Sequence, residues 1–308
     1  MKHLMYVPFL GLGLYGGYRG RRFLKNRIKI FKQFVIPSLS SQTNKDFILW
    51  ISWRYEDRKD PLVLELEQWL NTIPKFCENV VFTYCGVCFF DDKYPDEEAY
   101  ARLVNSVHGS MGELLNHIGE CKDVLMSIQP SDDVYHSGMV QETQDFFKGN
   151  SKIQVYGYKR GYVMDYINRR LSEWNPQTTP PFYTIRFPRE TFTDPLKHLT
   201  YIGPYRSHEF VKDYLPAHYS DTRGFIVGTH GMNISTVFDH PYTGHEYLGD
   251  NVEAILSLFG LRGVAPLKLY KSIRSDLFNA LPYSAKRKLR YWAEKNFLFS
   301  WVYNFLRS

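Results

Sequence analysis

The sequence predicts an α/β protein with a mostly parallel central sheet flanked by helices and with a C-terminal helical extension. Over the first 150 residues, short apolar runs alternate with segments of helical periodicity, the order that is typical of a parallel sheet. Hydrophobic residues make up 44% of the 308 residues and aromatic residues 17%, which excludes a disordered chain. Each apolar run is shorter than the roughly 18–20 residues that cross a bilayer.

Four apolar runs are the expected strands of this sheet. They are residues 4–10, 47–51, 80–84 and 124–128. Between them, apolar residues recur at steps of three and four, which predicts helices over residues 24–35, after Asp60, and over about 96–119. Asp60 is a suitable N-cap because Pro61 follows it at the first helical position. A further helix is expected after the fourth strand, with Ser137 as its N-cap.

From about residue 152 the pattern changes to Tyr-rich short strands and Pro-rich turns, with no linker before residue 261. We therefore expect one domain over residues 1–261 and a separate tail over residues 262–308. The tail holds ten basic and two acidic residues of a chain whose net charge is +6, so residues 1–261 are slightly acidic. We do not expect a nucleic-acid-binding protein, because residues 1–261 carry no excess of positive charge.

The four cysteines all lie between Cys77 and Cys121, too few and too clustered for a disulfide framework. Cys85 and Cys88 form a single C-x-x-C on an expected strand, and we expect buried thiols there rather than a zinc or redox site. This cysteine usage predicts a reducing, cytoplasmic location.

The strongest candidate site is Ser131-Asp132-Asp133, directly after the fourth strand. In parallel sheets, ligands bind beyond the carboxyl ends of the strands, where Pro8 and Phe9 also end the first strand. Two adjacent carboxylates repel each other, and a bound cation that also holds nucleotide phosphates relieves that repulsion. A helix N-cap or a plain turn explains the same residues equally well.

Three segments resemble inverting family 2 glycosyltransferases of the GT-A fold, closest to the rhamnosyltransferase group. The first is Pro37-Ser38-Leu39-x-x-Gln42-Thr43-x-x-Asp46-Phe47, similar to the turn that ends the first helix of these enzymes. The second is Ser131-Asp132-Asp133-Val134-Tyr135, which resembles their acidic motif. The third runs from Arg223 to Asn233 and resembles the segment whose His completes a metal site. The similarity covers roughly residues 4–260.

The resemblance implies a GT-A domain over residues 1–261, with a donor-binding half of about 1–150 and an acceptor half of about 151–261. It implies transfer of a sugar from a nucleotide-sugar donor to a glycan or lipid-linked acceptor, inverting by direct displacement. Mn²⁺ or Mg²⁺ would be held by Asp133 and His230, with Asp132 as a ligand or ribose contact. Pro8 and Phe9 would line the nucleotide. Pro130 stands where the longer family pattern has its first acid.

An inverting transfer needs one base to take the proton of the acceptor hydroxyl. Three carboxylates are candidates, namely Glu209, Asp239 and Glu246. Glu209 is preferred because it follows Tyr205-Arg206-Ser207-His208 at an expected helix start. In the alternative interpretation, Ser207 and Glu209 only cap a helix and have no catalytic role.

Two other functions stay open on the sequence. A nucleotidyltransferase also presents acidic residues on an α/β sheet to a nucleotide, and residues 11–17 with the Arg21-Arg22 pair offer glycines and positive charge near the first strand. A non-catalytic protein that binds glycans or nucleotides on a degraded GT-A fold is favoured by Pro130.

The tail is expected to form a helix from Ala285 with Ser284 as its cap. Its apolar stripe consists of Leu289, Trp292, Phe299, Val302 and Leu306, widened by Phe297, Trp301 and Phe305. A basic first turn followed by an aromatic face is typical of a helix on an anionic membrane surface, which predicts a peripheral protein on the inner face of the membrane. A helix packed on the body is the alternative.

Overall fold

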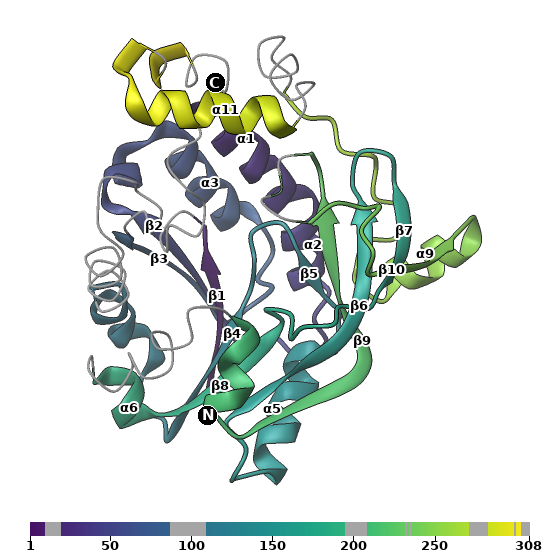
Figure 1. The fold of residues 1–308 in the computed structure, drawn as a ribbon. Coiled ribbons are helices and arrows are strands. Elements are labelled where there is room, and N and C mark those ends of the chain that lie inside the picture. Colours follow the sequence, from purple (N-terminus) through teal and green to yellow (C-terminus); the bar gives the residue numbers. More distant parts are fainter. Residues whose placement is uncertain are drawn as a thin grey trace.

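The computed structural model describes residues 1–9, 20–86, 109–194, 208–231, 233, 236–270, 283–298 and 300–302. It is a mixed α/β structure with a central sheet flanked by helices, as the sequence predicts (Figure 1). The four expected strands correspond to β1 (Lys2–Pro8), β2 (Ile48–Arg54), β3 (Asn79–Gly86) and β4 (Asp123–Ile128). They lie in the order β3-β2-β1-β4 and are parallel throughout, so their carboxyl ends share one edge.

The helices that connect these strands begin where the sequence places them. The segment after β1 consists of α1 (Gly20–Ile30), a π-helical turn (Phe31–Val35) and α2 (Ile36–Ser40). Helix α3 (Pro61–Thr72) follows a 3₁₀ turn (Tyr55–Lys59), and the Asp60 carboxylate accepts a hydrogen bond from the Leu62 N–H at 2.8 Å, which confirms Asp60 as its cap. Of the helix expected over 96–119, residues 109–118 are helical, and 87–108 lie outside the described residues.

The second half of the chain extends the sheet with antiparallel strands. The added strands are β6 (Val155–Asp165), β7 (Arg170–Trp174), β8 (Tyr183–Pro188) and β10 (Thr243–Tyr247), giving the order β10-β7-β6-β8-β4-β1-β2-β3. The long strand β9 (Ala217–Thr229) runs parallel to β6 and also pairs with β5 (Val134–Tyr135). Because β5 follows directly after β4, the end of β9 meets the segment beyond the parallel half of the sheet.

The chain beyond β5, including the tail, holds further helices. They are α5 (Met139–Gly149), α6 (Arg189–Thr193), the 3₁₀ turn His208–Phe210, α8 (Val211–Tyr214), α9 (Asp250–Ser257) and α11 (Tyr283–Lys295). Helix α11 confirms the expected C-terminal helical extension, but it includes Tyr283 and Ser284, so Ser284 is not its cap. Figure 1 draws it in yellow across the end of the molecule that α1 occupies. Within the described ranges, no helix has both the length and the apolar character needed to span a membrane.

The prediction that Ser137 caps α5 is wrong. The helix starts one residue later, with Gly138 at the N-cap. The Gln42 side chain accepts a hydrogen bond from the Val140 N–H at 3.1 Å, and the His136 ring accepts one from the Gly138 N–H at 3.2 Å. A distant glutamine therefore satisfies one of the donors that a local serine was expected to satisfy.

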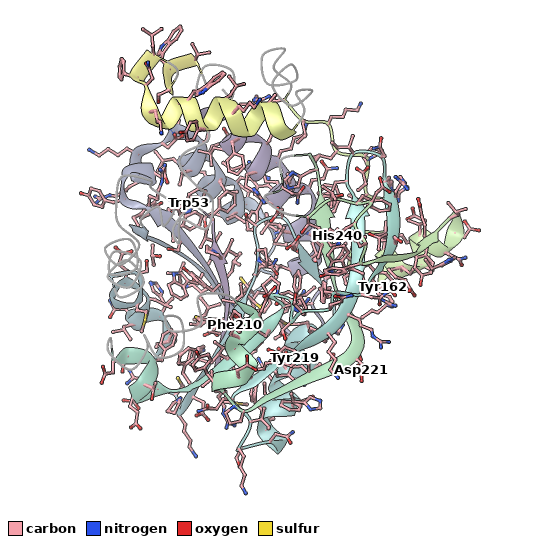
Figure 2. The ribbon with its side chains drawn as sticks, viewed as in Figure 1. Trp53, Tyr162, Phe210, Tyr219, Asp221 and His240 are labelled. Atoms are coloured by element: carbon pink, nitrogen blue, oxygen red, sulfur yellow. The ribbon has the colours of Figure 1, made fainter. Side chains whose placement is uncertain are left out.

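Apolar side chains fill both faces of the sheet. On one face the Phe9 ring stacks on Trp53 with centroids 4.4 Å apart and meets the edge of Phe31. Figure 2 labels Trp53 within this layer. On the other face Tyr6 and Trp50 pack with centroids 4.1 Å apart. Burial of both faces explains why β1 and β2 have nearly continuous apolar runs instead of alternating ones.

The packing of the body continues past the boundary expected at residue 261. Leu267 is buried in the core, and its N–H donates to the Tyr166 carbonyl at 2.7 Å. Tyr270 exchanges two hydrogen bonds with the Asn26 side chain of α1. Residues up to Tyr270 are therefore held against the first domain.

We predict that stability falls on acidification because of His3. His3 is buried, its Nε2 lies 2.7 Å from the Ser127 hydroxyl, and burial lowers the pKa of His3 to about 3. The unfolded chain takes up this proton near pH 6.5, whereas the folded chain does not. The free energy of unfolding should therefore be fully present above pH 6.5 and decline below it, by about 2 kcal/mol between pH 7 and 5.

Urea denaturation at pH 7 and pH 5 measures this loss in the wild type, in His3→Gln and in His218→Gln, which alters an exposed histidine. The loss should shrink in His3→Gln and persist in His218→Gln. An equal loss in all three proteins would contradict the assignment.

Candidate functional site

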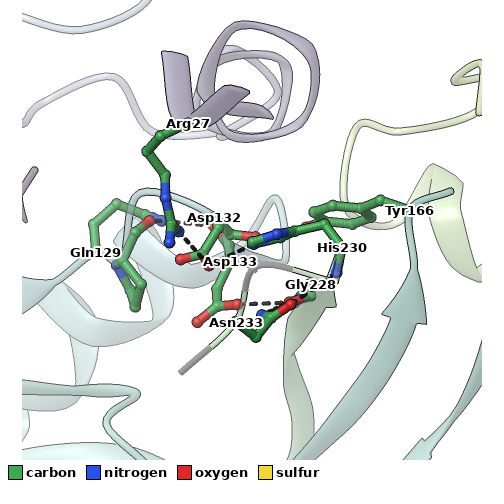
Figure 3. Close-up of polar contacts among 9 residues, drawn as sticks. Arg27, Gln129, Asp132, Asp133, Tyr166, Gly228, His230 and Asn233 are labelled. Carbon is green, nitrogen blue, oxygen red and sulfur yellow. Dashed lines mark hydrogen bonds and ion pairs between the residues drawn. The ribbon is translucent and has the colours of Figure 1, made fainter. Parts of the chain in front are cut away.

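The candidate site forms where the link between β4 and β5 meets the end of β9. Val134 and Tyr135 pair with Ile226 and Phe225, and this pairing brings Asp132 and Asp133 next to the residues that end β9. His230 follows β9 directly. Figure 3 shows the two aspartates and His230 close together, with Arg27 entering from another part of the chain. The structure thus brings together Asp132, Asp133 and His230, and their role as metal ligands stays a prediction.

Asp132 is bound by two cationic or potentially cationic side chains. The Arg27 guanidinium of α1 forms an ion pair with Asp132 Oδ2, and His230 Nε2 lies 3.0 Å from the same oxygen. All three side chains are almost completely buried. Burial alone would raise the pKa of Asp132, but the Arg27 charge and the hydrogen bond from His230 outweigh it and hold that pKa at about 2. Asp132 is therefore an ionised carboxylate in the interior.

The protonation of His230 follows from the same contacts. Burial lowers the pKa of His230, and the nearby positive charge of Arg27 acts in the same direction. The hydrogen bond to Asp132 opposes these effects without reversing them. The neutral ring then has to carry its proton on Nε2, because the ionised Asp132 can only accept.

Asp133 has different partners from Asp132. Its Oδ1 accepts a hydrogen bond from the Gly228 N–H at 2.8 Å, and Figure 3 shows its carboxylate turned toward Gly228. Burial, followed by repulsion from Asp132, raises the pKa of Asp133 well above its ordinary value. Asp133 is half-buried, and so it is the more accessible of the two carboxylates.

The turn after β9 is built around these contacts. Asn233 accepts from the His230 N–H at 2.8 Å and donates to the Gly228 carbonyl at 2.6 Å. A Cβ at Gly228 would overlap the Tyr166 ring and the Asp132 carbonyl oxygen, so only glycine permits this approach. The Tyr166 hydroxyl donates to that same carbonyl at 2.9 Å. Backbone and side-chain contacts thus fix Asp132 from two directions.

The motif that carries the sequence resemblance has a structural role beneath the site. The Ser38 hydroxyl donates to the Tyr135 carbonyl at 2.7 Å, and the Gln42 amide donates to the His136 carbonyl at 2.8 Å. The Thr43 N–H donates to the Ser137 carbonyl at 2.8 Å. These bonds fasten the end of α2 and the turn after it to the segment that directly follows Asp132 and Asp133.

A divalent metal does not fit the side chains as they are placed. Asp132 Oδ2 is bound by Arg27 and His230, and His230 directs Nε2 at Asp132 instead of at a common centre. A Mn²⁺ or Mg²⁺ ion here would also lie beside the guanidinium, which repels it. Over the described ranges, no three His, Cys, Asp or Glu side chains form a group that could hold a metal ion. The requirement for Mn²⁺ or Mg²⁺ stays a prediction of the sequence.

The candidate bases come from separate places. Glu209 is half-buried and belongs to the 3₁₀ turn His208–Phe210. Arg170 binds Glu246 through two hydrogen bonds of 2.8 Å and lies 3.5 Å from Asp239. Figure 2 labels Phe210, which follows Glu209, well apart from His240, which follows Asp239.

The contacts with Arg170 make its partner Glu246 less suited to the role of base. The hydrogen bond from Arg170 lowers the pKa of Glu246, and a more acidic carboxyl is a weaker base. Asp239 shares the same guanidinium. Glu209 therefore stays the preferred base as a prediction.

The side chains of Pro8 and Phe9, at the end of the first strand, are both buried. Phe9 is completely buried between Trp53 and Phe31, and Pro8 is buried beside Ser52 of β2. The role of Pro8 and Phe9 in nucleotide binding stays a prediction. The Gly-rich stretch 11–17 lies outside the described residues.

A cavity of about 430 Å³ lies elsewhere on the molecule. It is lined by residues that include Lys159, Arg160, Lys212 and Tyr219. Tyr219 pairs with Gly157 of β6, whereas Thr229, next to His230, pairs with Asp165 at the far end of that strand. Figure 2 shows Tyr219 and Asp221 on the first part of β9. This cavity is therefore remote from Asp132 and Asp133.

Sequence reasoning missed Arg27 and Tyr166, and it named Gln42 only as part of the segment 37–47, with no role at the site. A signal for Arg27 was present, because it lies three residues after Leu24 and four before Phe31, on the apolar face of a predicted helix. A charge on such a face indicates a buried partner. Tyr166 carries no local signal, since its importance comes from strand pairing far along the chain.

Comparison with known proteins gives low similarities. No family model matches the sequence, and no curated protein matches it. Two structures of S. aureus TarS are similar at 14% and 15% identity over 74% of this chain, with TM-scores of 0.38 and 0.39. This chain spans 60% of the TarS 1–349 structure and 37% of the longer one.

The apo form of mouse xyloside xylosyltransferase 1 is similar at 9% identity over 76% of this chain and 99% of that one, with a TM-score of 0.38. TM-scores below 0.5 do not establish a shared fold.

We predict that Gln42→Ala lowers the free energy of unfolding by about 1–3 kcal/mol, because it leaves the buried Val140 N–H and the partly buried His136 carbonyl without this partner. Gln141→Ala, an exposed glutamine of α5, should change stability by less than about 0.5 kcal/mol. Urea denaturation of both variants is the measurement. Equal stabilities would show that Gln42 does not fasten the site.

Proposed function

We propose that this chain is a glycosyltransferase that moves a sugar from a nucleotide-sugar donor to a glycan or lipid-linked acceptor. The observation that carries the proposal is the meeting of Asp132 and Asp133, at the carboxyl edge of the parallel strands, with His230 from a segment 98 residues away. The three segments that resemble family 2 glycosyltransferases also lie together there. Ligands of open α/β sheets bind at this edge.

In the proposed reaction the acceptor hydroxyl oxygen forms a bond to the anomeric carbon of the donor. The bond from that carbon to the β-phosphate oxygen breaks, and the nucleoside diphosphate leaves with the electron pair. Glu209 takes the hydroxyl proton, and the displacement inverts the anomeric configuration. Asp133 contacts the bound donor, and Asp132 fixes the position of that segment. No step runs through a metal ion, since Asp132 is already neutralised by Arg27.

We propose dTDP-rhamnose as the first donor to test, on the resemblance to the rhamnosyltransferase group alone, since no residue in the sequence selects a deoxysugar. The proposal therefore ranks dTDP-rhamnose above UDP- and GDP-sugars. The acceptor is a glycan or a lipid-linked sugar in either case.

We predict that a nucleotide-sugar raises the melting temperature of the protein, and that Asp133→Asn removes this increase. Asp133 is the half-buried carboxylate at the site, so it is the one that a ligand reaches. Asp221→Asn serves as a control because Asp221 is exposed on β9, away from the site. The measurement is thermal melting with dTDP-rhamnose, UDP-glucose and GDP-mannose, each with and without Mn²⁺.

An increase with one donor that persists in Asp221→Asn and vanishes in Asp133→Asn supports the proposal. Binding without release of nucleoside diphosphate in the presence of glycan acceptors would favour the non-catalytic alternative. Turnover of a nucleoside triphosphate and a sugar phosphate would favour a nucleotidyltransferase. No increase with any donor would contradict a donor site at Asp133.

We also propose that the C-terminal segment holds the protein on an anionic membrane surface, close to a lipid-linked acceptor. Its apolar side chains are strongly exposed, with Phe297 at 90%, Leu298 at 72% and Trp301 at 62% of their full accessibility. Helix α11, which precedes them, has the sequence Lys286-Arg287-Lys288 in its first half. Aromatic residues next to basic ones are typical of peripheral membrane helices.

We predict that replacing Phe297, Leu298 and Trp301 together by Ser weakens co-sedimentation with phosphatidylglycerol vesicles at least tenfold. Three large apolar side chains would no longer enter the interface. Val237→Ser with Leu248→Ser is the matched control, since both residues are exposed apolar residues outside the tail. Equal binding of the two variants would contradict the proposed role of the tail.

A further inference from the structure

Arg27 is a completely buried cation in the first helix after β1. Its side chain is 1% exposed, its guanidinium pairs with Asp132, and the Phe23 ring lies 5.2 Å from the guanidinium carbon. A buried charge is strongly unfavourable unless a partner of opposite charge compensates it. Arg27 and Asp132 therefore stabilise each other. Removing either charge would leave the other one buried without a partner of opposite charge.

The Arg27–Asp132 pair neutralises the site differently from a metal ion. A metal ion between two aspartates would neutralise both carboxylates and present positive charge to the phosphates of a nucleotide. Here Arg27 already neutralises Asp132, and Asp133 is turned toward the Gly228 N–H. A guanidinium keeps its charge at every physiological pH and needs no ligand exchange.

The location of Arg27 makes this charge a fixed one. It is carried by α1, in which Leu24, nearly one turn earlier, and the adjacent Ile28 are also buried. Asp132 is in turn held by His230 and by the Tyr166 hydroxyl at its carbonyl. The Arg27–Asp132 ion pair is therefore preorganised and does not have to form when a ligand arrives.

We propose that Arg27 is a positioning residue that takes the place of the expected metal ion, so that a nucleoside diphosphate binds at this site without a divalent cation. The inference rests on the proposed function, because it names what the donor site requires. It contradicts the Mn²⁺ or Mg²⁺ that the sequence resemblance implies.

Isothermal titration of the full chain with dTDP, UDP and GDP tests the inference, each titration with 5 mM Mn²⁺ and with EDTA. Electron paramagnetic resonance of Mn²⁺ with the protein provides a second readout that does not depend on nucleotide. For the wild type we expect dissociation constants that agree within twofold in Mn²⁺ and EDTA, and a free-Mn²⁺ spectrum.

Variants separate the charge of Arg27 from its packing. Arg27→Lys keeps the charge, and nucleotide binding should stay independent of Mn²⁺. Arg27→Gln exposes Asp132 to an incoming cation, so nucleotide binding in EDTA should weaken at least tenfold and recover in part with Mn²⁺. If Arg27→Gln does not fold, the double variant Arg27→Gln with Asp132→Asn removes both buried charges, and its nucleotide binding should be weak with or without Mn²⁺.

If the wild type binds nucleotide at least tenfold more tightly in Mn²⁺ than in EDTA, the inference is overturned and the proposed function stands. A bound-Mn²⁺ spectrum in the wild type would overturn it independently of any nucleotide. Arg27→Gln with the same binding and the same metal response as the wild type would also overturn it. Failure of all three nucleotides to bind under every condition would overturn both the inference and the proposed function.

Discussion

The contact on which the site depends is the buried ion pair between Arg27 of α1 and Asp132 after β4. It joins the first helix to the loop that follows the fourth strand, and His230 adds the end of β9 to the same carboxylate. An ionised carboxylate in the interior is unfavourable without such partners. The pair and His230 together therefore fix three distant segments at one point, and they leave Asp133, the more accessible carboxylate, at the carboxyl edge of the parallel strands.

A second set of contacts holds the same loop from its other end. Ser38 and Gln42 bind the backbone of Tyr135 and His136, and Gln42 also caps α5. These are side-chain bonds to backbone groups that would otherwise be buried without partners. The segment 37–47, one of the three that carry the sequence resemblance, thus positions the loop that holds Asp132 and Asp133 and does not contact their carboxylates through these bonds.

The parallel half of the fold could be predicted because local patterns determine it. Continuous apolar runs mark β1 to β4, and Asp60 with Pro61 marks the start of α3. The site could be predicted in part, because Asp132 and Asp133 follow a strand directly. Arg27 and Tyr166 could not be assigned, since their partners lie 105 and 34 residues away in the chain. Ser137 was wrongly expected to cap α5 because a distant Gln42 supplies that contact.

The most direct test of the account is a crystal structure of the protein soaked with a nucleoside diphosphate and Mn²⁺, with data collected at the manganese absorption edge. We expect the diphosphate next to Asp133, Arg27 still paired with Asp132, and no anomalous peak between the two aspartates. An anomalous peak there, with the Arg27 guanidinium displaced from Asp132, would contradict the account. The diphosphate bound at a different place on the molecule would contradict the location of the site.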